Sequence, residues 1–176
     1  MKKKDLVAVA VISFIWAVLT IVLNLTQTYW GFVGVLFVTG LFACLVAFLV
    51  KKIGSVLLFF CLGGIFSIGF DNLGLGYWKL LVLPLMGVVF ELAYFGLRME
   101  FKNLAVDGLI AAALSNGALP FLMMLLIKGG NRDILSYAIN FSIIAALSGI
   151  CGAVVMSILW YYIKSTEFVV KFQYSS

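Results

Sequence analysis

The polar side chains that lie in or beside the apolar stretches of this chain are the groups best suited to recognise a ligand. They combine amides with aromatic rings and gather at three breaks between apolar runs: Asn24, Gln27, Trp30, Trp78, Tyr137 and Asn140. Rings stack on planar molecules and amides fix their orientation, so this mixture predicts a site for a small organic ligand. An interfacial belt of tyrosine and tryptophan needs no ligand, and the sequence leaves that alternative open.

Asn116 is a further candidate for ligand binding because it lies four residues before Pro120 in the fifth apolar run. Proline has no amide hydrogen, so the carbonyl of Asn116 loses its helical partner and we expect a bend there. Such a bend beside an amide can line a cavity, although neighbouring helices can also satisfy the carbonyl. Asn140 and Ser142 are expected to face this point across the pocket.

Glu91 is the one carboxylate placed well inside an apolar run. Charges at membrane depth are costly and usually serve a ligand, a proton or a partner. Glu91 is therefore a candidate counter-charge for a cationic ligand or a proton site. The alternative is a structural carboxyl near the inner interface, within reach of Arg98.

The residue types exclude several kinds of chemistry. The chain has no histidine, which removes the commonest general base, haem ligation by histidine and most zinc sites. No Walker lysine motif is present, so the chain cannot energise transport with ATP by itself. We expect neither an enzyme nor a bound metal or cofactor.

The composition identifies the elements that position these residues. Of the 176 residues, 65% are hydrophobic and 11% are charged, whereas soluble domains average roughly 45–50% and 25%. The apolar residues form six runs, each of about the length that crosses a bilayer as a helix. The runs cover residues 6–26, 31–50, 54–70, 79–97, 104–127 and 135–163. The sequence predicts an all-α, polytopic membrane protein, a six-transmembrane-helix bundle in a single domain over residues 1–176.

The basic residues predict the orientation of this bundle. With the N-terminus inside, nine of the twelve basic residues fall on the cytoplasmic side: Lys2, Lys3, Lys4, Lys51, Lys52, Arg98, Lys102, Lys164 and Lys171. Cytoplasmic loops are enriched in lysine and arginine. We therefore expect both termini in the cytoplasm of a cell with this protein in its plasma membrane. The +5 net charge reflects topology, and no nucleic-acid partner is expected.

Two predicted helices carry stripes of small residues, which allow close helix contacts in a membrane. The first stripe contains Ala10, Ser13 and Ala17, and the sixth run contains Ala145, Gly149, Ala153 and Ser157. Packing within the chain accounts for both stripes. The alternative is that one of them, in the first helix, docks the helices of a partner subunit.

Three features together resemble the substrate-binding S-components of energy-coupling factor vitamin transporters. A lysine-led first helix bearing small residues opens a chain of under 200 residues, and residues 147–153 (LSGICGA) lie in the last run. Residues 85–92 (LMGVVFEL) are similar to a glycine and Glu-Leu pattern of that family. The first helix differs from the family in carrying Ser13 and Ala17 in place of a full AxxxA.

The resemblance implies a subunit that binds a vitamin or related small molecule in the bilayer. Such a subunit works with a transmembrane coupling subunit and two ATPase subunits, and its pocket lies in the outer half. A structural or assembly subunit of a larger complex, without transport, is the alternative, and a small stand-alone carrier is another.

Overall fold

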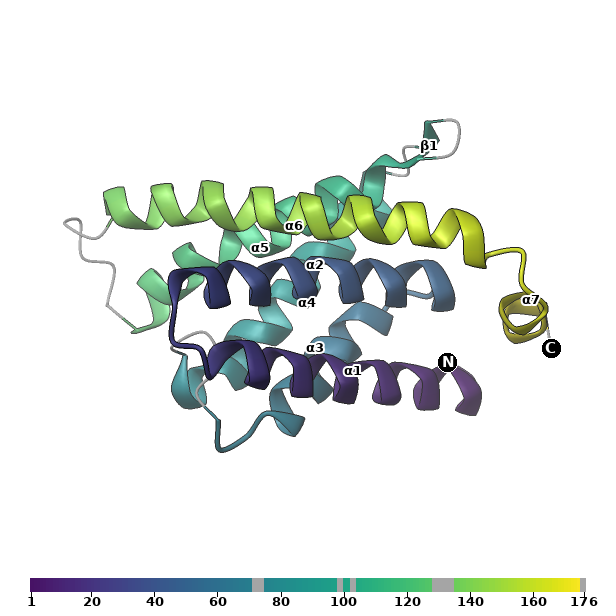
Figure 1. Cartoon of the computed structure of the whole chain (residues 1–176), viewed down its shortest axis with the longest axis horizontal. Coiled ribbons are helices and arrows are strands. Elements are labelled where there is room, and N and C mark those ends of the chain that lie inside the picture. The colour runs from purple at the N-terminus through teal and green to yellow at the C-terminus, as the bar shows by residue number, and fades with distance from the viewer. Residues whose placement is uncertain (71–74, 98–99, 102–103, 128–134, 175–176) are drawn as a thin grey trace.

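The computed structural model describes residues 1–70, 75–97, 100–101, 104–127 and 135–174. Five helices are long and apolar enough to cross a membrane, and they form most of the bundle in Figure 1. These are α1 (Lys3–Asn24), α2 (Tyr29–Val50), α4 (Lys79–Leu97), α5 (Val106–Ile127) and α6 (Leu135–Ile163). The described part of the chain thus has the fold of a multi-pass, all-α membrane protein.

The shorter elements connect or cover these helices. They are α3 (Ser55–Phe66), the 3-10 turn η1 (Gly76–Trp78), strands β1 (Glu100–Phe101) and β2 (Leu104–Ala105), and α7 (Glu167–Tyr174). The two strands pair antiparallel, with Glu100 opposite Ala105, between α4 and α5. Helix α3 has 12 residues, a rise of about 18 Å against a hydrocarbon core of about 30 Å. Five of the six predicted spans therefore have full length, and the third is shorter than predicted.

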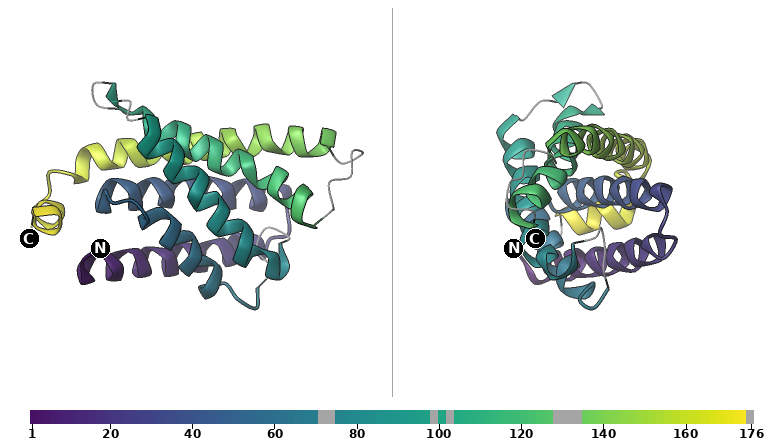
Figure 2. Two further views of the ribbon diagram at one scale, coloured as in Figure 1. Left: turned by 180° about the vertical axis from the view of Figure 1, so that it is seen from behind. Right: turned by 90° about the vertical axis from the view of Figure 1, so that its left-hand side faces the viewer.

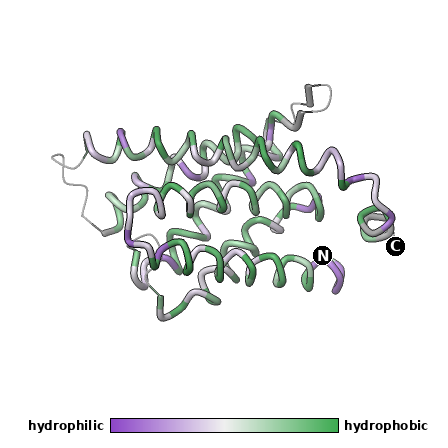
Figure 3. The backbone as a smooth tube through the Cα atoms, in the orientation of Figure 1, coloured by the Kyte–Doolittle hydropathy of each residue, from purple (hydrophilic) through white to green (hydrophobic). Residues whose placement is uncertain are grey.

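Successive helices run in alternating directions, so the bundle has two distinct ends (Figures 1 and 2). The N-terminus, the end of α2 and α7 lie at one end, which we call the basic end after Lys2, Lys4, Lys51 and Lys52. The α1–α2 connection and the starts of α4 and α6 lie at the other, which we call the aromatic end after Tyr29, Trp30, Tyr77, Trp78 and Tyr137. Hydrophobic residues predominate along the helices between them (Figure 3).

Helices α2, α5 and α6 meet at a junction of close backbone contacts. A Cβ on Gly149 would lie 2.7 Å from the carbonyl oxygen of Ala112, and one on Gly40 would lie 2.6 Å from the carbonyl oxygen of Gly149. Only a residue without a side chain allows the backbones to approach this closely. Ala145 and Ala153 on the same face of α6 are fully buried. The stripe in the sixth helix therefore packs within the chain.

The stripe in the first helix also faces inward. Ser13 and Ala17 are buried, while Ala10 is half-buried. The hydroxyl of Ser13 donates to the carbonyl oxygens of Val9 in α1, at 2.7 Å, and Phe59 in α3, at 3.1 Å. The structure thus places the predicted docking residues Ala10, Ser13 and Ala17 on a face whose centre contacts the chain's own helix α3.

Candidate functional site

The aromatic end brings together six of the eight predicted ligand residues. Asn24 ends α1 and is half-buried, Gln27 lies exposed in the connection, and Trp30 is 77% exposed at the start of α2. Trp78, Tyr137 and Asn140 belong to η1 and the first turns of α6, and all three are exposed. Residues from three separate connections thus share one end of the molecule.

The aromatic rings at this end belong to neighbouring helices. The rings of Tyr29 and Trp30 meet edge to face with centroids 5.7 Å apart. One turn further into the bundle, Phe32 of α2 and Phe141 of α6 meet at 6.1 Å, which fixes the starts of these helices side by side. Exposed rings on two adjacent helix ends can stack on a planar molecule.

Asn116 lies apart from these six residues, in the middle of α5. It is 1% exposed, and its amide nitrogen donates to the carbonyl oxygen of Leu36 in α2 at 2.8 Å. The same amide nitrogen lies 2.7 Å from the position that a Cβ on Gly149 would take. In this structure Asn116 joins α5 to α2 beside α6.

The proline turn of α5 is also bound by α6. Helix α5 continues through Pro120, and the hydroxyl of Ser142 donates to the carbonyl oxygen of Gly117 at 2.6 Å. Ser142 therefore contacts this turn directly, at the carbonyl of Gly117, rather than across a pocket. Asn140, one half-turn earlier in α6, is exposed and remains with the residues of the aromatic end.

Glu91 binds the start of the short helix α3. Its Oε2 accepts the backbone N–H of Gly54 at 2.8 Å, and its Oε1 accepts those of Val56 at 2.8 Å and Leu57 at 3.1 Å. The first N–H groups of a helix have no partner within it, and a carboxylate there also complements the helix dipole. The geometry matches the structural alternative for Glu91, with backbone amides as partners; Arg98 lies outside the described residues.

Lys79 binds the opposite end of α3. The sequence places it at the start of the apolar run 79–97 and predicts no role for it, yet the residue is 2% exposed. Its ammonium group donates to the carbonyl oxygens of Ser67 and Phe70, just beyond the last turn of α3. The sequence offered no signal of this role, because the apolar run 54–70 is longer than α3.

A second polar cluster lies at the basic end and is absent from the sequence-based prediction. Four lysines and one carboxylate surround a cavity of about 250 Å³ between α1, α2 and α7. The sequence analysis used the lysines only as signals of orientation. Their convergence depends on the N-terminus, the end of α2 and the C-terminal helix meeting in space, which no local pattern encodes.

Comparison of the chain with protein-family models, with curated proteins and with solved structures finds no match.

Proposed function

We propose that this chain is the substrate-binding membrane subunit of an uptake system for a vitamin-like small molecule. The observation that supports this function is the gathering of Gln27, Trp30, Trp78, Tyr137 and Asn140 at one end of the bundle, all with exposed side chains. Rings from α2, η1 and α6 offer stacking surfaces around that end, and the amides offer directional hydrogen bonds.

The orientation proposed from the basic residues is consistent with uptake. Lysines at the basic end favour the cytoplasm, so the aromatic end faces outward, where a nutrient arrives. Because the chain lacks a Walker lysine motif, the energy for release comes from partners. We propose a transmembrane coupling subunit with two ATPase subunits, as the resemblance of residues 147–153 and 85–92 to the S-component pattern implies.

A structural subunit of a larger membrane complex is the second candidate, favoured by one observation. Asn116 and Glu91 are the two buried residues predicted to bind a ligand. Asn116 donates a hydrogen bond to a backbone carbonyl of the chain, and Glu91 accepts hydrogen bonds from backbone N–H groups. Buried polar groups that are satisfied internally fix the packing of a bundle. A subunit of this kind needs no small-molecule site at the aromatic end.

Thermal stabilisation by a panel of water-soluble vitamins separates these two functions. The purified chain should gain stability with one member of the panel, and the double variant Trp30→Ala/Tyr137→Ala should lose that gain. Tyr161→Ala is the matched control, because Tyr161 is an exposed ring on the same helix α6 at the basic end.

Co-purification provides the second readout. An uptake subunit should retain ATPase subunits when isolated from its native membrane in mild detergent. No stabilisation by any vitamin, together with a stable complex that contains no ATPase, contradicts the proposed uptake function and supports the structural role.

A further inference from the structure

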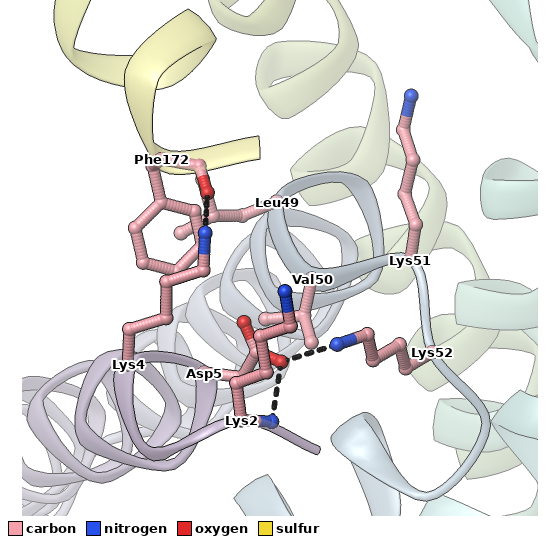
Figure 4. A pocket seen from close by; sticks show the side chains of 8 residues that line it. All are labelled: Lys2, Lys4, Asp5, Leu49, Val50, Lys51, Lys52 and Phe172. Carbon is pink, nitrogen blue, oxygen red and sulfur yellow. Dashed lines mark hydrogen bonds and ion pairs between the residues drawn. The ribbon is translucent and has the colours of Figure 1, made fainter. Parts of the chain in front are cut away.

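The cavity at the basic end is lined by both charged and apolar groups (Figure 4). Its lining contains four lysines, one aspartate and three apolar residues: Lys2, Lys4, Lys51, Lys52, Asp5, Leu49, Val50 and Phe172. Three elements far apart in the sequence contribute these residues, namely the first turn of α1, the end of α2 and α7. The cavity therefore belongs to the folded bundle rather than to one basic segment.

Asp5 organises the cavity by joining α1 to the end of α2. Its Oδ2 accepts the ammonium of Lys52 at 2.5 Å and the backbone N–H of Lys2 at 2.9 Å. The carboxylate is nearly buried, with 5% of its side chain exposed. Lys51, which ends α2 in a left-handed conformation with φ of 51°, turns the chain so that the side chains of the two adjacent lysines separate (Figure 4).

The cavity holds an excess of positive charge. Asp5 is the one carboxylate among the lining residues, against four lysines. Lys4 donates to the carbonyl oxygen of Phe172 at 2.5 Å and lies 5.3 Å from the centre of its ring, so this ammonium group is held at the cavity. Like charges held together at the edge of a low-dielectric bundle favour a bound anion.

Helix α7 covers the cavity from the side of the C-terminus. It lies across the end of the bundle, whereas the long helices run lengthwise (Figures 1 and 2). Val169 is buried, Val170 is half-exposed, and Phe172 reaches the cavity. A short helix placed across the ends of membrane spans has the position of an interfacial helix. The ammonium groups therefore lie at the level of the lipid headgroups.

We propose that this cavity binds the phosphate of an anionic phospholipid. The ammonium groups of Lys2, Lys4 and Lys52 bind the phosphate oxygens, while Leu49 and Val50 contact the glycerol and the first carbons of the acyl chains. Basic pockets between membrane helices on the cytoplasmic side suit such headgroups. This inference does not depend on the proposed uptake function.

The phosphate group is common to lipids and to soluble phosphate esters, and the cavity wall distinguishes them. A soluble phosphate has no group to place against Leu49, Val50 and the Phe172 ring, whereas a phospholipid covers them with its acyl chains. The apolar part of the wall therefore commits the proposal to a lipid source.

The test compares two double variants of the full chain, purified in a neutral detergent. Lys2→Gln/Lys4→Gln removes two cavity lysines and leaves the Asp5–Lys52 pair in place. Lys3→Gln/Lys164→Gln removes the same charge from the same end outside the cavity. Native mass spectrometry measures the binding of added phosphatidylglycerol and of phosphatidylcholine, and glycerol phosphate is added as a soluble competitor.

The wild type should bind phosphatidylglycerol about tenfold or more tightly than phosphatidylcholine. The cavity variant should lose about tenfold in affinity for phosphatidylglycerol, and the control variant should stay within about twofold of the wild type. Glycerol phosphate at the same concentration should leave the lipid bound.

Three results would overturn the proposal. Equal binding of the two lipids removes the role of the headgroup charge, and equal losses in the two double variants assign binding to the overall charge of this end. Displacement by equimolar glycerol phosphate makes the site one for soluble phosphate esters. Circular dichroism monitors folding, and if the cavity variant fails to fold, the single variant Lys2→Gln, at an exposed residue, replaces it, with Lys3→Gln as its control.

Discussion

Lys79 and Glu91, twelve residues apart on α4, hold the two ends of the twelve-residue helix α3. The separation along α4 corresponds to a rise of about 18 Å, which equals that of α3, and the two helices pack side by side. The carboxylate is at the N-terminus of α3 and the ammonium at its C-terminus, as the helix dipole favours. A helix too short to span the bilayer thus has its first N–H groups bound by Glu91, while Lys79 binds carbonyls just beyond its last turn.

Replacing Glu91 with leucine should destabilise the bundle by about 2–4 kcal/mol, because three backbone N–H groups lose their acceptor in a dry environment. Glu91→Gln retains one acceptor oxygen and should lose less. Unfolding in mixed detergent micelles, followed by circular dichroism, measures both variants. Wild-type stability of Glu91→Leu would contradict the capping role and return Glu91 to the ligand-binding or proton-binding candidates.

The close contact at Gly40 predicts a large effect from a single methyl group. Gly40→Ala places a Cβ 2.6 Å from the carbonyl oxygen of Gly149. This clash is between backbone-fixed atoms, so it can be relieved only if α2 or α6 moves. We expect a loss of about 1–3 kcal/mol. Gly96→Ala is the control, since a Cβ there meets nothing within 4 Å, and it should cause no loss. Equal melting temperatures for the two variants would show that α2 and α6 are not this close.

Asn116 and Asn140 test whether the predicted ligand residues act as one site. Asn116→Leu removes the hydrogen bond to the Leu36 carbonyl and should destabilise the fold by about 1–2 kcal/mol. Asn140→Leu, at an exposed position, should leave stability unchanged. The same two variants, titrated with a vitamin that stabilises the wild type, report on binding. Unchanged stability of Asn116→Leu combined with weaker binding would restore Asn116 to the ligand site.

The orientation of the bundle predicts opposite labelling of two exposed positions. Gln27→Cys at the aromatic end should react with an impermeant maleimide added outside intact cells. Ile53→Cys, at a residue 76% exposed at the basic end, should react only after the membrane is opened. The background carries alanine at Cys44, Cys61 and Cys151 so that each reaction reports one position. The reverse pattern would put the aromatic end in the cytoplasm and contradict uptake at that end.

The long helices could be predicted from the sequence because a helix satisfies the backbone hydrogen bonds of an apolar run within that run. The predicted span 79–97 coincides with α4, and the predicted span 135–163 coincides with α6. The predicted span 54–70 was too long, because α3 ends at Phe66 and the apolar residues after Phe66 lie outside the helix. Hydropathy measures whether a residue avoids water and not whether its backbone is helical.

The polar contacts could be predicted only in part, because they depend on partners far apart in the chain. Glu91 stood out as a buried carboxylate, yet its partners lie 34 to 37 residues earlier. Lys79 begins the predicted span 79–97, and nothing near it in the sequence shows that it is buried. Its burial depends on the carbonyls of Ser67 and Phe70. The cavity at the basic end likewise requires α7 to lie against the first turn of α1. Pairings of this kind follow from packing and not from spacing along one helix.

The junction at Gly149 also has a consequence for the order in which the protein is made. Because α6 follows α2 and α5 in the chain, these two helices are synthesised before the backbone that packs between Gly40 and Ala112 exists. The close contacts of Gly149 with α2 and α5 therefore form after those two helices. A nascent chain halted before residue 149 therefore lacks the backbone that packs against both Gly40 and Ala112.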